Sequence, residues 1–522
     1  MKELVYHRSF MPSLSRHTGS AAVVDGEYSA SFEKHADRVF RLAHALKHQF
    51  GLTRHDRFAV LARNSHVYLE LYHAAFMGGG VVNPLNLRLN ARELDYIIRD
   101  SGVEIVFVDQ TFAPLLEEAM GQDGASPIRK VILIGEGEGP FDDRYEDVLA
   151  AAEPNVPEEP EEEDAAVLMY TGGTTGLPKG VVLTQRSLIL NMYHSRISRP
   201  SMGANTVSLI QTPMFHVASM GTLITTYIVG GTTVIVPGFD PELVLGEIER
   251  NQVTTTLMVP TMIGMMVNHP SFAPERLSSV TELTYGASPM PAVLLDKLLT
   301  MAPHLNLYQG YGMTESSAMV TSLSPDDHRQ GGKRLRSVGQ SVAGVEVVIL
   351  DENGDELPTG EIGEVCARGG NFMTKYWNKA EATGEAFRGG WYHTGDAGYL
   401  DDGGYLFLVD RVKDMIITGG ENVYSVEVEN AIASHPDVQQ VAVIGIPHET
   451  WGEAVHAIVV VDEGSVLEAE AVIEHARQSI AGFKVPKSVD FRHEPLPLSG
   501  AMKVLKRDLR APFWEGQDKA IS

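Results

Sequence analysis

Short apolar, β-branched runs alternate with helical patterns through the first 150 residues of the chain. Phe58–Leu61 and Ile105–Val108 are typical of buried strands, whereas Phe32–Phe50 and Leu69–Phe76 carry apolar residues at helical spacing. Parallel strands need long crossover connections, which are usually helices. The alternation therefore predicts an α/β fold with a largely parallel sheet covered by helices.

The length of the chain, 522 residues, exceeds what one hydrophobic core can serve, because single cores stop growing near about 250–300 residues. From Val345 onward short strands separated by Gly, Asp and Asn turns predict an antiparallel or barrel-like subdomain: Val347–Leu350, Gly363–Ala367 and Gly404–Val409. After Asp410 and Arg411 the remaining residues suffice for a small α+β domain. We therefore predict domains at residues 1–410 and 411–522.

No Asp, Glu, Lys or Arg occurs between Arg199 and Asp240, so a membrane span has to be considered there. Glycines and a proline interrupt this stretch, and it divides into two β-rich runs around a helical one: Val207–Gln211, Ser219–Val229 and Thr232–Val236. We interpret it as buried α/β structure rather than as an integral membrane segment.

Charge and cysteine content exclude several classes of protein. The formal net charge of -26 repels phosphate backbones and anionic lipids, so neither nucleic acid nor a membrane surface is an expected partner. The single cysteine, Cys366, and a first segment (Met1–Pro12) without a continuous apolar stretch fit a cytoplasmic protein. The Pro-rich acidic stretch Glu153–Asp164 is expected to be a solvated spacer.

The segment Tyr170–Gly180 has the sequence YTGGTTGLPKG. Its glycines permit tight bends, and its amides and hydroxyls can form a nest for phosphate oxygens, with Lys179 adding a cation. It is not a Walker loop, because Gly180 rather than Ser or Thr follows Lys179. By spacing alone, a phosphate loop and an ordinary Gly/Thr turn both stay open.

This loop resembles the phosphate-loop signature of the adenylate-forming (ANL) superfamily, which includes acyl- and aryl-CoA synthetases. Further segments resemble that family's other signatures in the same order: Pro213–His216, Gly286–Pro289, Tyr311–Glu315, Trp391–Asp396, Asp410–Asp414 and Gly419–Asn422. The resemblance covers nearly the whole chain and is strongest to fatty-acid–CoA ligases. It implies a large N-terminal domain of two α/β subdomains plus a β-barrel-like subdomain, and a small mobile α+β C-terminal domain.

The resemblance also implies roles for individual residues. ATP or AMP would contact Thr171, Gly172, Gly173, Thr174, Thr175, Gly176, Lys179, Gly286, Ala287, Ser288, Gly310, Tyr311, Gly312, Met313, Thr314, Asp396, Arg411 and Lys503. The acyl pocket would be formed by His216, Val217, Ala218, Gly286, Gly312 and Ser316, and the CoA tunnel by Gly419, Gly420 and Glu421. Glu315 would hold Mg2+, a hard cation that prefers oxygen ligands, and the catalytic set would be Lys503, His216, Thr171 and Glu315.

The C-terminal signature carries two departures from the family pattern. Lys503 matches the lysine that bridges the substrate carboxylate and the α-phosphate, but Met502 stands where the family commonly has glycine. Ser425 stands where the family often has proline, with little expected consequence. Lys413 matches the hinge about which the small domain rotates between the two half-reactions.

These observations predict an ATP-dependent ligase that converts a carboxylic acid to an acyl-AMP and then to an acyl-CoA. The segments expected at the acyl pocket are mostly small and uncharged, which favours a fatty or aromatic acid over an amino acid: His216–Ser219, Gly286–Ser288 and Ser316–Met319. The alternatives are an acyl-AMP ligase that loads a separate carrier protein and a non-catalytic nucleotide- or acyl-binding relative. The expected small-molecule partners are the acid, ATP and CoA, and the oligomeric state stays open, with a homodimer as one option.

Overall fold

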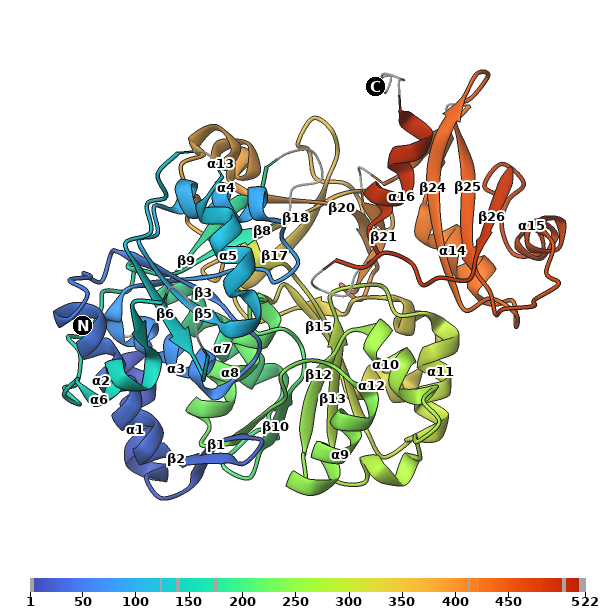
Figure 1. The fold of residues 1–522 in the computed structure, drawn as a ribbon. Helices are drawn as coiled ribbons and strands as arrows, with labels where there is room; N and C mark the ends of the chain where they lie inside the picture. The colour runs from blue at the N-terminus through green and yellow to red at the C-terminus, as the bar shows by residue number, and fades with distance from the viewer. Residues whose placement is uncertain are drawn as a thin grey trace.

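The structure is a computed structural model that describes residues 4–122, 124–137, 141–171, 177–411, 414–419, 421–499 and 504–515. Its strands form four sheets (Figure 1). Two are long sheets of eight and nine strands, the third has four strands, and the last has five and belongs to the C-terminal part.

The eight-stranded sheet comes mostly from the first 184 residues. Its strand order is β19 (Lys375–Tyr376), β9 (Lys179–Thr184), β8 (Ala165–Thr171), β4 (Val81–Pro84), β3 (Arg57–Leu61), β5 (Ile105–Asp109), β6 (Lys130–Ile134) and β7 (Asp143–Arg144). Strands β8, β4, β3, β5, β6 and β7 run parallel, as the alternation predicted.

Helices cover both faces of this sheet, because successive strand residues point to opposite sides. Phe58 and Phe107 pack with helices α2 (Phe32–His48), α3 (His66–Ala74) and α6 (Tyr145–Ala150). Ala59 and Val106 pack on the other face with α4 (Ala91–Ser101) and α5 (Ala113–Met120).

The nine-stranded sheet has the order β16 (Gln340–Ser341), β15 (Thr321–Leu323), β14 (Asn306–Tyr311), β13 (Glu282–Gly286), β12 (Thr255–Met258), β10 (Val207–Ile210), β11 (Thr232–Ile235), β1 (Ala21–Asp25) and β2 (Tyr28–Ser31). Its outer face is covered by α9 (Pro241–Asn251), α10 (Pro260–Val267) and α11 (Ala292–Met301). The charge-free region forms β10, β11 and the helix α8 (Val217–Ile228). Among the residues described, no helix has both the length and the apolar character of a membrane span.

One core joins the two long sheets. Residues of α7 (Gln185–Ser198) and α8 pack in the same buried cluster as residues of both sheets and of α1 (His7–His17), and Figure 1 shows these helices in the middle of the larger part. The hairpin β1–β2 belongs to the second sheet although it opens the chain, because Val23 pairs with Thr233 of β11. The first sheet is therefore built without the first two strands of the sequence.

The four-stranded sheet is antiparallel, in the order β17 (Val345–Leu350), β18 (Gly363–Gly369), β20 (Tyr392–Leu400) and β21 (Leu406–Arg411). This agrees with the antiparallel prediction, and β17 and β21 stand at the two edges of an open sheet. Short helices lie before and beside it, α12 (Pro325–Gln330) and α13 (Ala380–Ala386).

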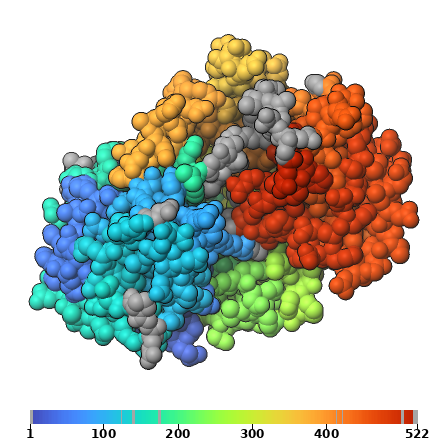
Figure 2. Space-filling view, turned by 45° about the horizontal axis from the view of Figure 1, so that its top comes forward, coloured from blue at the N-terminus to red at the C-terminus, as the bar shows by residue number. Residues whose placement is uncertain are grey.

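The C-terminal part carries its own sheet and its own apolar core. The order is β23 (Glu421–Val423), β22 (Ile416–Thr418), β25 (Gly452–Val460) and β24 (Gln440–His448), with β26 (Ser488–Arg492) parallel to β25. Helices α14 (Ser425–Ala433), α15 (Ala469–Arg477) and α16 (Lys506–Trp514) pack around it. Figure 2 shows the red residues of this part lying against the larger part of the molecule.

The acidic stretch Glu153–Asp164 differs from the expected free spacer. Arg8 pairs with Glu159, Arg186 bonds to Glu162 at 2.6 Å, and Arg54 lies 3.2 Å from Asp164. Each exposed pair contributes about 0–1 kcal/mol at most, so these contacts attach the connector to the surface without holding the fold together.

Candidate active site

The ends of the Gly/Thr loop are fixed by a hairpin. Strands β8 and β9 are antiparallel, and their last register pair places Thr171 opposite Lys179. The ammonium of Lys179 lies 5.0 Å from the centroid of the Tyr376 ring. The predicted phosphate-loop residues Gly172, Gly173, Thr174, Thr175 and Gly176 lie outside the described residues.

Glu315 follows β14 on a short 3-10 turn, Thr314–Ser316. The hydroxyl of Tyr376 donates to its Oε1 at 2.9 Å, and the amide of Met373 donates to its backbone carbonyl at 2.7 Å. Burial raises the pKa of the Glu315 carboxyl, and the Tyr376 bond and the positive charge of Lys179 oppose that rise. A desolvated carboxylate beside the phosphate-loop hairpin fits a Mg2+ ligand, since the cation would restore the stability of the charged form.

Three side chains meet where the ribose is expected. The Tyr311 hydroxyl donates to Asp396 Oδ2 at 2.6 Å, and Arg411 Nε lies 3.7 Å from Asp396 Oδ1. Burial raises the pKa of Tyr311 well above its ordinary value, and the charge of Asp396 adds to that effect. Asp396 therefore presents hydrogen-bond acceptors at the junction of β14, β20 and β21, beside a cation, and is suited to accept from sugar hydroxyls.

A bulge in β20 carries Asp396 to this position. Cys366 pairs with His393 and Glu364 pairs with Ala397, so β18 has one residue between these pairs where β20 has three. The extra residues leave the ladder at Gly395, which has φ 72, a value that favours glycine.

Close backbone approach explains two of the predicted glycines. A Cβ on Gly286 would lie 2.2 Å from the Gly310 carbonyl of the neighbouring strand, and one on Gly312 would lie 2.0 Å from the Ala318 carbonyl. Ala287, Ser317 and Ala318 have φ values of 66, 53 and 110. Such φ values are costly for residues with side chains, and here they gather on the two loops beside Tyr311.

Hydrogen bonds from Asn64 and Tyr72 fix the backbone of the segment that precedes His216. Asn64 donates to the Thr212 carbonyl at 3.0 Å and accepts from the Met214 amide at 2.8 Å, while the Tyr72 hydroxyl donates to the Met214 carbonyl at 2.6 Å. His216 precedes the first turn of α8, where Val217 and Ala218 lie. The fold therefore places three of the predicted acyl-pocket residues, His216, Val217 and Ala218, together at the start of α8.

Polar atoms without partners lie behind this helix. A Cβ on Gly221 of α8 would lie 2.9 Å from Asn191 Nδ2 and 4.0 Å from Ala318 Cβ, so α7, α8 and the 316–319 loop converge. Asn191 Oδ1 and Ser317 Oγ are both buried and have no hydrogen-bond partner within the described structure. Buried groups of this kind normally find one, and a ligand is a candidate source.

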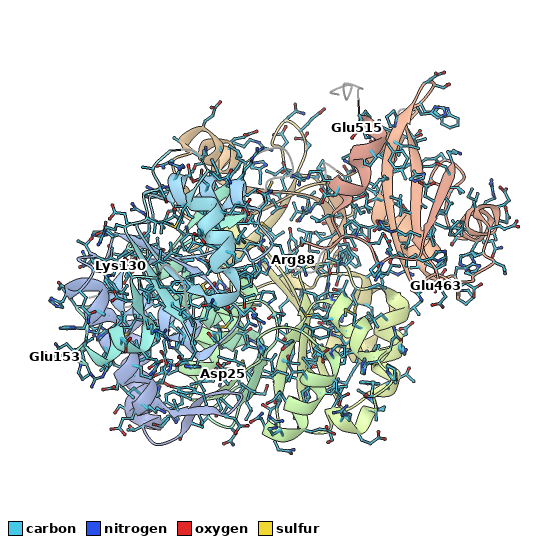
Figure 3. The ribbon with its side chains drawn as sticks, viewed as in Figure 1. Asp25, Arg88, Lys130, Glu153, Glu463 and Glu515 are labelled. Atoms are coloured by element: carbon cyan, nitrogen blue, oxygen red, sulfur yellow. The ribbon has the colours of Figure 1, made fainter. Side chains whose placement is uncertain are left out.

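The C-terminal part reaches the site through the segment before Lys503. Arg88 Nη1 donates to the carbonyls of Leu498 and Ser499 at 2.7 and 2.8 Å. Figure 3 labels Arg88 on the larger part, facing the C-terminal one. Met502 and Lys503 lie outside the described residues, as do Lys413 and Gly420.

Ser425 has more structural consequence than we expected from the sequence. It is fully buried, its amide and hydroxyl both donate to Asp410 Oδ2, and Lys506 Nζ donates to its Oγ at 2.7 Å. Proline could replace none of these bonds. Nearby, the amide of Gly419 donates to the Trp451 carbonyl at 2.9 Å, and Glu421 begins β23.

The structure thus brings several predicted residues together: Tyr311, Asp396 and Arg411 form one cluster, and Glu315 and Lys179 both lie beside Tyr376. Sequence reasoning missed residues that support these groups: Asn64, Asn191, Glu364 and Tyr376. Only Asn191 left a sequence signal, as a lone polar residue in the apolar run Leu188–Met192.

Comparisons with known proteins agree with this geometry. The AMP-binding enzyme family matches residues 11–377, and the AMP-binding enzyme C-terminal domain matches residues 427–503. A feruloyl-CoA synthase of an Amycolatopsis species is 36% identical over 496 residues, 95% of this chain and 96% of that protein. The fatty acid–[acyl-carrier-protein] ligase ScoC of Streptomyces coeruleorubidus is 34% identical, with 92% and 91% covered. The ATP-bound crystal structure of MatB from Rhodopseudomonas palustris superposes with a TM-score of 0.89 at 30% identity, covering 99% of each chain.

Proposed function

The chain belongs to the AMP-binding enzyme family, and from that premise we propose that it joins an apolar carboxylic acid to CoA through an acyl-adenylate. It is an AMP-forming acid–thiol ligase: ATP and the acid give acyl-AMP and pyrophosphate, and the thiol then displaces AMP. The Tyr311–Asp396–Arg411 cluster is the observation that carries the nucleotide half of the proposal.

The residues act by positioning and by charge. Asp396 and Arg411 hold the ribose, so the α-phosphorus is fixed relative to the acid. Glu315 binds Mg2+, which offsets the repulsion between the acid and the triphosphate when bound. Lys503 supplies a cation between the carboxylate and the α-phosphate, and the contact of Arg88 with Leu498 and Ser499 supports its delivery from the C-terminal part.

The proposed acid is an aromatic one with a polar ring substituent. The residues that α8 and the 316–319 loop offer to the expected acyl pocket are mostly small and uncharged, and Asn191 Oδ1 and Ser317 Oγ beside them are buried without a hydrogen-bond partner in the described structure. An alkyl chain would leave both atoms unpaired, whereas a phenolic hydroxyl can donate to one of them. The similarity to a feruloyl-CoA synthase supports this choice over a plain fatty acid.

A carrier-protein ligase is the second candidate function, because a relative of that kind covers nearly the whole chain. The Gly419–Glu421 segment would face the pantetheine arm in either case, so the two functions differ only in the acceptor that carries this arm. CoA and a phosphopantetheinylated carrier protein, offered to the same acyl-AMP, separate them by which thioester forms.

The remaining proposals concern the whole molecule. We place the domain boundary near 410–413, with Lys413 as the pivot of a rotation that exchanges Lys503 for the CoA segment. A reducing compartment such as the cytoplasm is supported by the buried single thiol of Cys366. The homodimer stays a prediction that mass measurement in solution tests.

The deciding experiment is pyrophosphate release with MgATP across ferulate, cinnamate, benzoate and fatty acids, with and without CoA, for wild type and Lys503→Ala. Acid-dependent release that collapses in the variant, with an acyl-CoA formed by the wild type, is the expected result. Release that the variant retains would overturn the role of Lys503, and no release with any acid would overturn the ligase function.

A further inference from the structure

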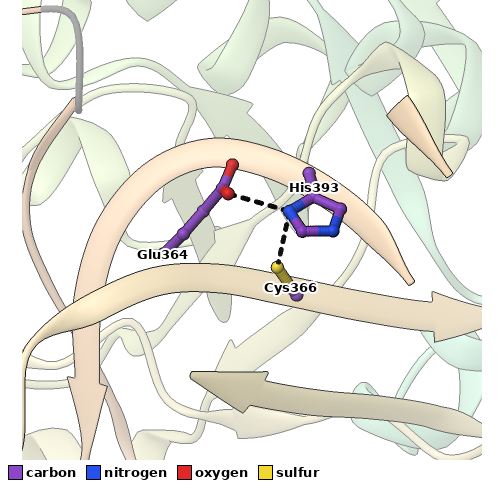
Figure 4. Close-up of side chains that lie close together, drawn as sticks. All are labelled: Glu364, Cys366 and His393. Carbon is purple, nitrogen blue, oxygen red and sulfur yellow. Dashed lines mark hydrogen bonds and ion pairs between the residues drawn. The ribbon is translucent and has the colours of Figure 1, made fainter. Parts of the chain in front are cut away.

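Glu364, Cys366 and His393 form a cluster beside the Asp396 bulge that the proposed function does not use (Figure 4). Glu364 and Cys366 come from β18 and His393 comes from β20. His393 Nδ1 lies 2.8 Å from Glu364 Oε2 and 3.2 Å from Cys366 Sγ. The cluster ends where the bulge begins, because Thr394, Gly395 and Asp396 follow His393 directly.

The Glu364 carboxylate is the centre of this cluster. Its Oε2 also accepts from Arg388 Nη2 at 2.7 Å, and its Oε1 accepts from the Gly395 amide at 3.1 Å. Both oxygens are therefore engaged, one with Arg388 and His393 and one with the backbone of the bulge. Bonds from charged donors are about twice as strong as neutral ones, so this carboxylate has a well-defined orientation.

The histidine ring is held from two sides as well. Its Nε2 lies 3.2 Å from the Arg388 carbonyl, and its Nδ1 faces Glu364, so contacts on both nitrogens fix the orientation of the ring. Cys366 is fully buried, and burial raises the pKa of its thiol to about 12. The neutral thiol therefore packs behind the Glu364–His393 pair.

We propose that Glu364 is a positioning residue that holds the peptide of Gly395 so that Asp396 is aimed at the nucleotide ribose. A second bond supports the same geometry, since the Thr394 hydroxyl donates to the Val365 carbonyl at 2.7 Å and accepts from the Asp396 amide at 3.1 Å. Without Glu364 the Gly395 amide loses this carboxylate acceptor, and the glycine-centred bulge gains conformational freedom. The inference rests on the proposed nucleotide site.

The test measures equilibrium binding of AMP and of 2′,3′-dideoxy-AMP, which lacks the ribose hydroxyls, to wild type, Glu364→Ala and Glu364→Gln. The matched control is Glu346→Gln, because Glu346 pairs with Arg368 at 2.7 Å on the same sheet, away from the bulge. We expect Glu364→Ala to weaken AMP binding by about tenfold or more, while the affinity for dideoxy-AMP changes by less than about twofold. Glu364→Gln should be intermediate, because its amide oxygen still accepts from Gly395.

If Glu364→Ala lost affinity equally for both nucleotides, or if the Glu346→Gln control lost as much affinity for AMP, Glu364 would have only a general structural role. Either result would overturn the proposal. Stoichiometric zinc in the purified protein would also overturn it, because the ion would take the Glu364 oxygen. AMP binding needs no acid, so the result stands apart from the pyrophosphate assay. If wild type binds AMP yet activates no acid, the ligase function fails while the Glu364 proposal is still decided.

Discussion

The two ends of the candidate site are built in opposite ways. At the ribose end Asp396 is bonded to Tyr311 and paired with Arg411, and the bulge that carries it is tied to β18 by Glu364. At the acyl end Asn191 Oδ1 and Ser317 Oγ are buried without partners in the described structure.

This difference indicates that the two ends of the candidate site serve different functions. A polar network that is satisfied before the ligand binds is preorganised, and it serves a group that never changes, the ribose of ATP. A surface that leaves polar atoms unpaired discriminates, because only a ligand with matching groups satisfies them. The ribose end should therefore affect all acids equally, and the acyl end should affect each acid differently.

Glu315→Gln should have the largest effect, and one that does not depend on the acid. Loss of the Mg2+ ligand is expected to slow adenylation by about a thousandfold, equivalent to about 4 kcal/mol. Because the folded-state pKa of Glu315 is raised, its charge destabilises the apo protein at neutral pH. The variant should accordingly unfold at a higher temperature at pH 7, with the gain shrinking as pH falls. A lower melting temperature at pH 7 would contradict this account of burial.

Asp396→Ala should come next, with a loss of about 10- to 150-fold in kcat/KM for ATP, since hydrogen bonds to a charged group contribute about 1.5–3 kcal/mol. The loss should be the same for ferulate and for a fatty acid. The measurement is pyrophosphate release under varied ATP with each acid saturating. A loss in kcat/KM that differs between the two acids would contradict the proposal that the ribose end and the acyl end act independently.

Gly221→Ala should act only at the acyl end. The new Cβ would lie 2.9 Å from Asn191 Nδ2, so the Asn191 side chain has to move. We expect this movement to change the space available to the acid. A change of this size typically alters discrimination by about 1–3 kcal/mol, or 10- to 200-fold. Ratios of kcat/KM between bulky and small acids measure it, and the KM for ATP serves as the internal control.

Asn191→Leu should sharpen the comparison further. Replacing the unpaired amide by an apolar group is expected to lower the preference for a hydroxylated over an unsubstituted cinnamate by about tenfold. Stability should hold or rise, because a buried unpaired polar atom is removed. An unchanged preference would show that the ring substituent is bound elsewhere.

The smallest effect on activity is expected at His194, one turn along α7 from Asn191, where the prediction concerns stability. Burial lowers its pKa to about 4. The unfolded chain binds a proton near pH 6.5 that the folded one does not, so stability falls as pH drops from about 6.5 towards 4, by about 1.4 kcal/mol per pH unit. The acid-induced drop in melting temperature should be smaller in His194→Gln than in wild type. Equal drops in the two proteins would contradict the contribution of His194 to the pH dependence of stability.

The family and many local elements were predictable from the sequence because signatures and apolar periodicity are local. The order of the segments from Tyr170–Gly180 to Gly419–Asn422 indicated the family, and the comparisons confirm it. Alternation of apolar runs predicted the strands β3 and β5 and the helix α2 within a few residues of their observed bounds. The spacing of apolar residues and the residue types that form turns depend on neighbouring residues, so both can be read from a single sequence.

Contacts between distant residues were not predictable in this way. Nothing in the sequence assigns β1–β2 to the second sheet, joins Tyr376 to Glu315 across 61 residues, or makes Glu364 the support of Gly395. The sequence by itself determined the local elements, the glycine positions and the chemical groups available. The tertiary structure alone decided which of them meet, because strand register and the β20 bulge depend on packing between chain segments far apart in sequence.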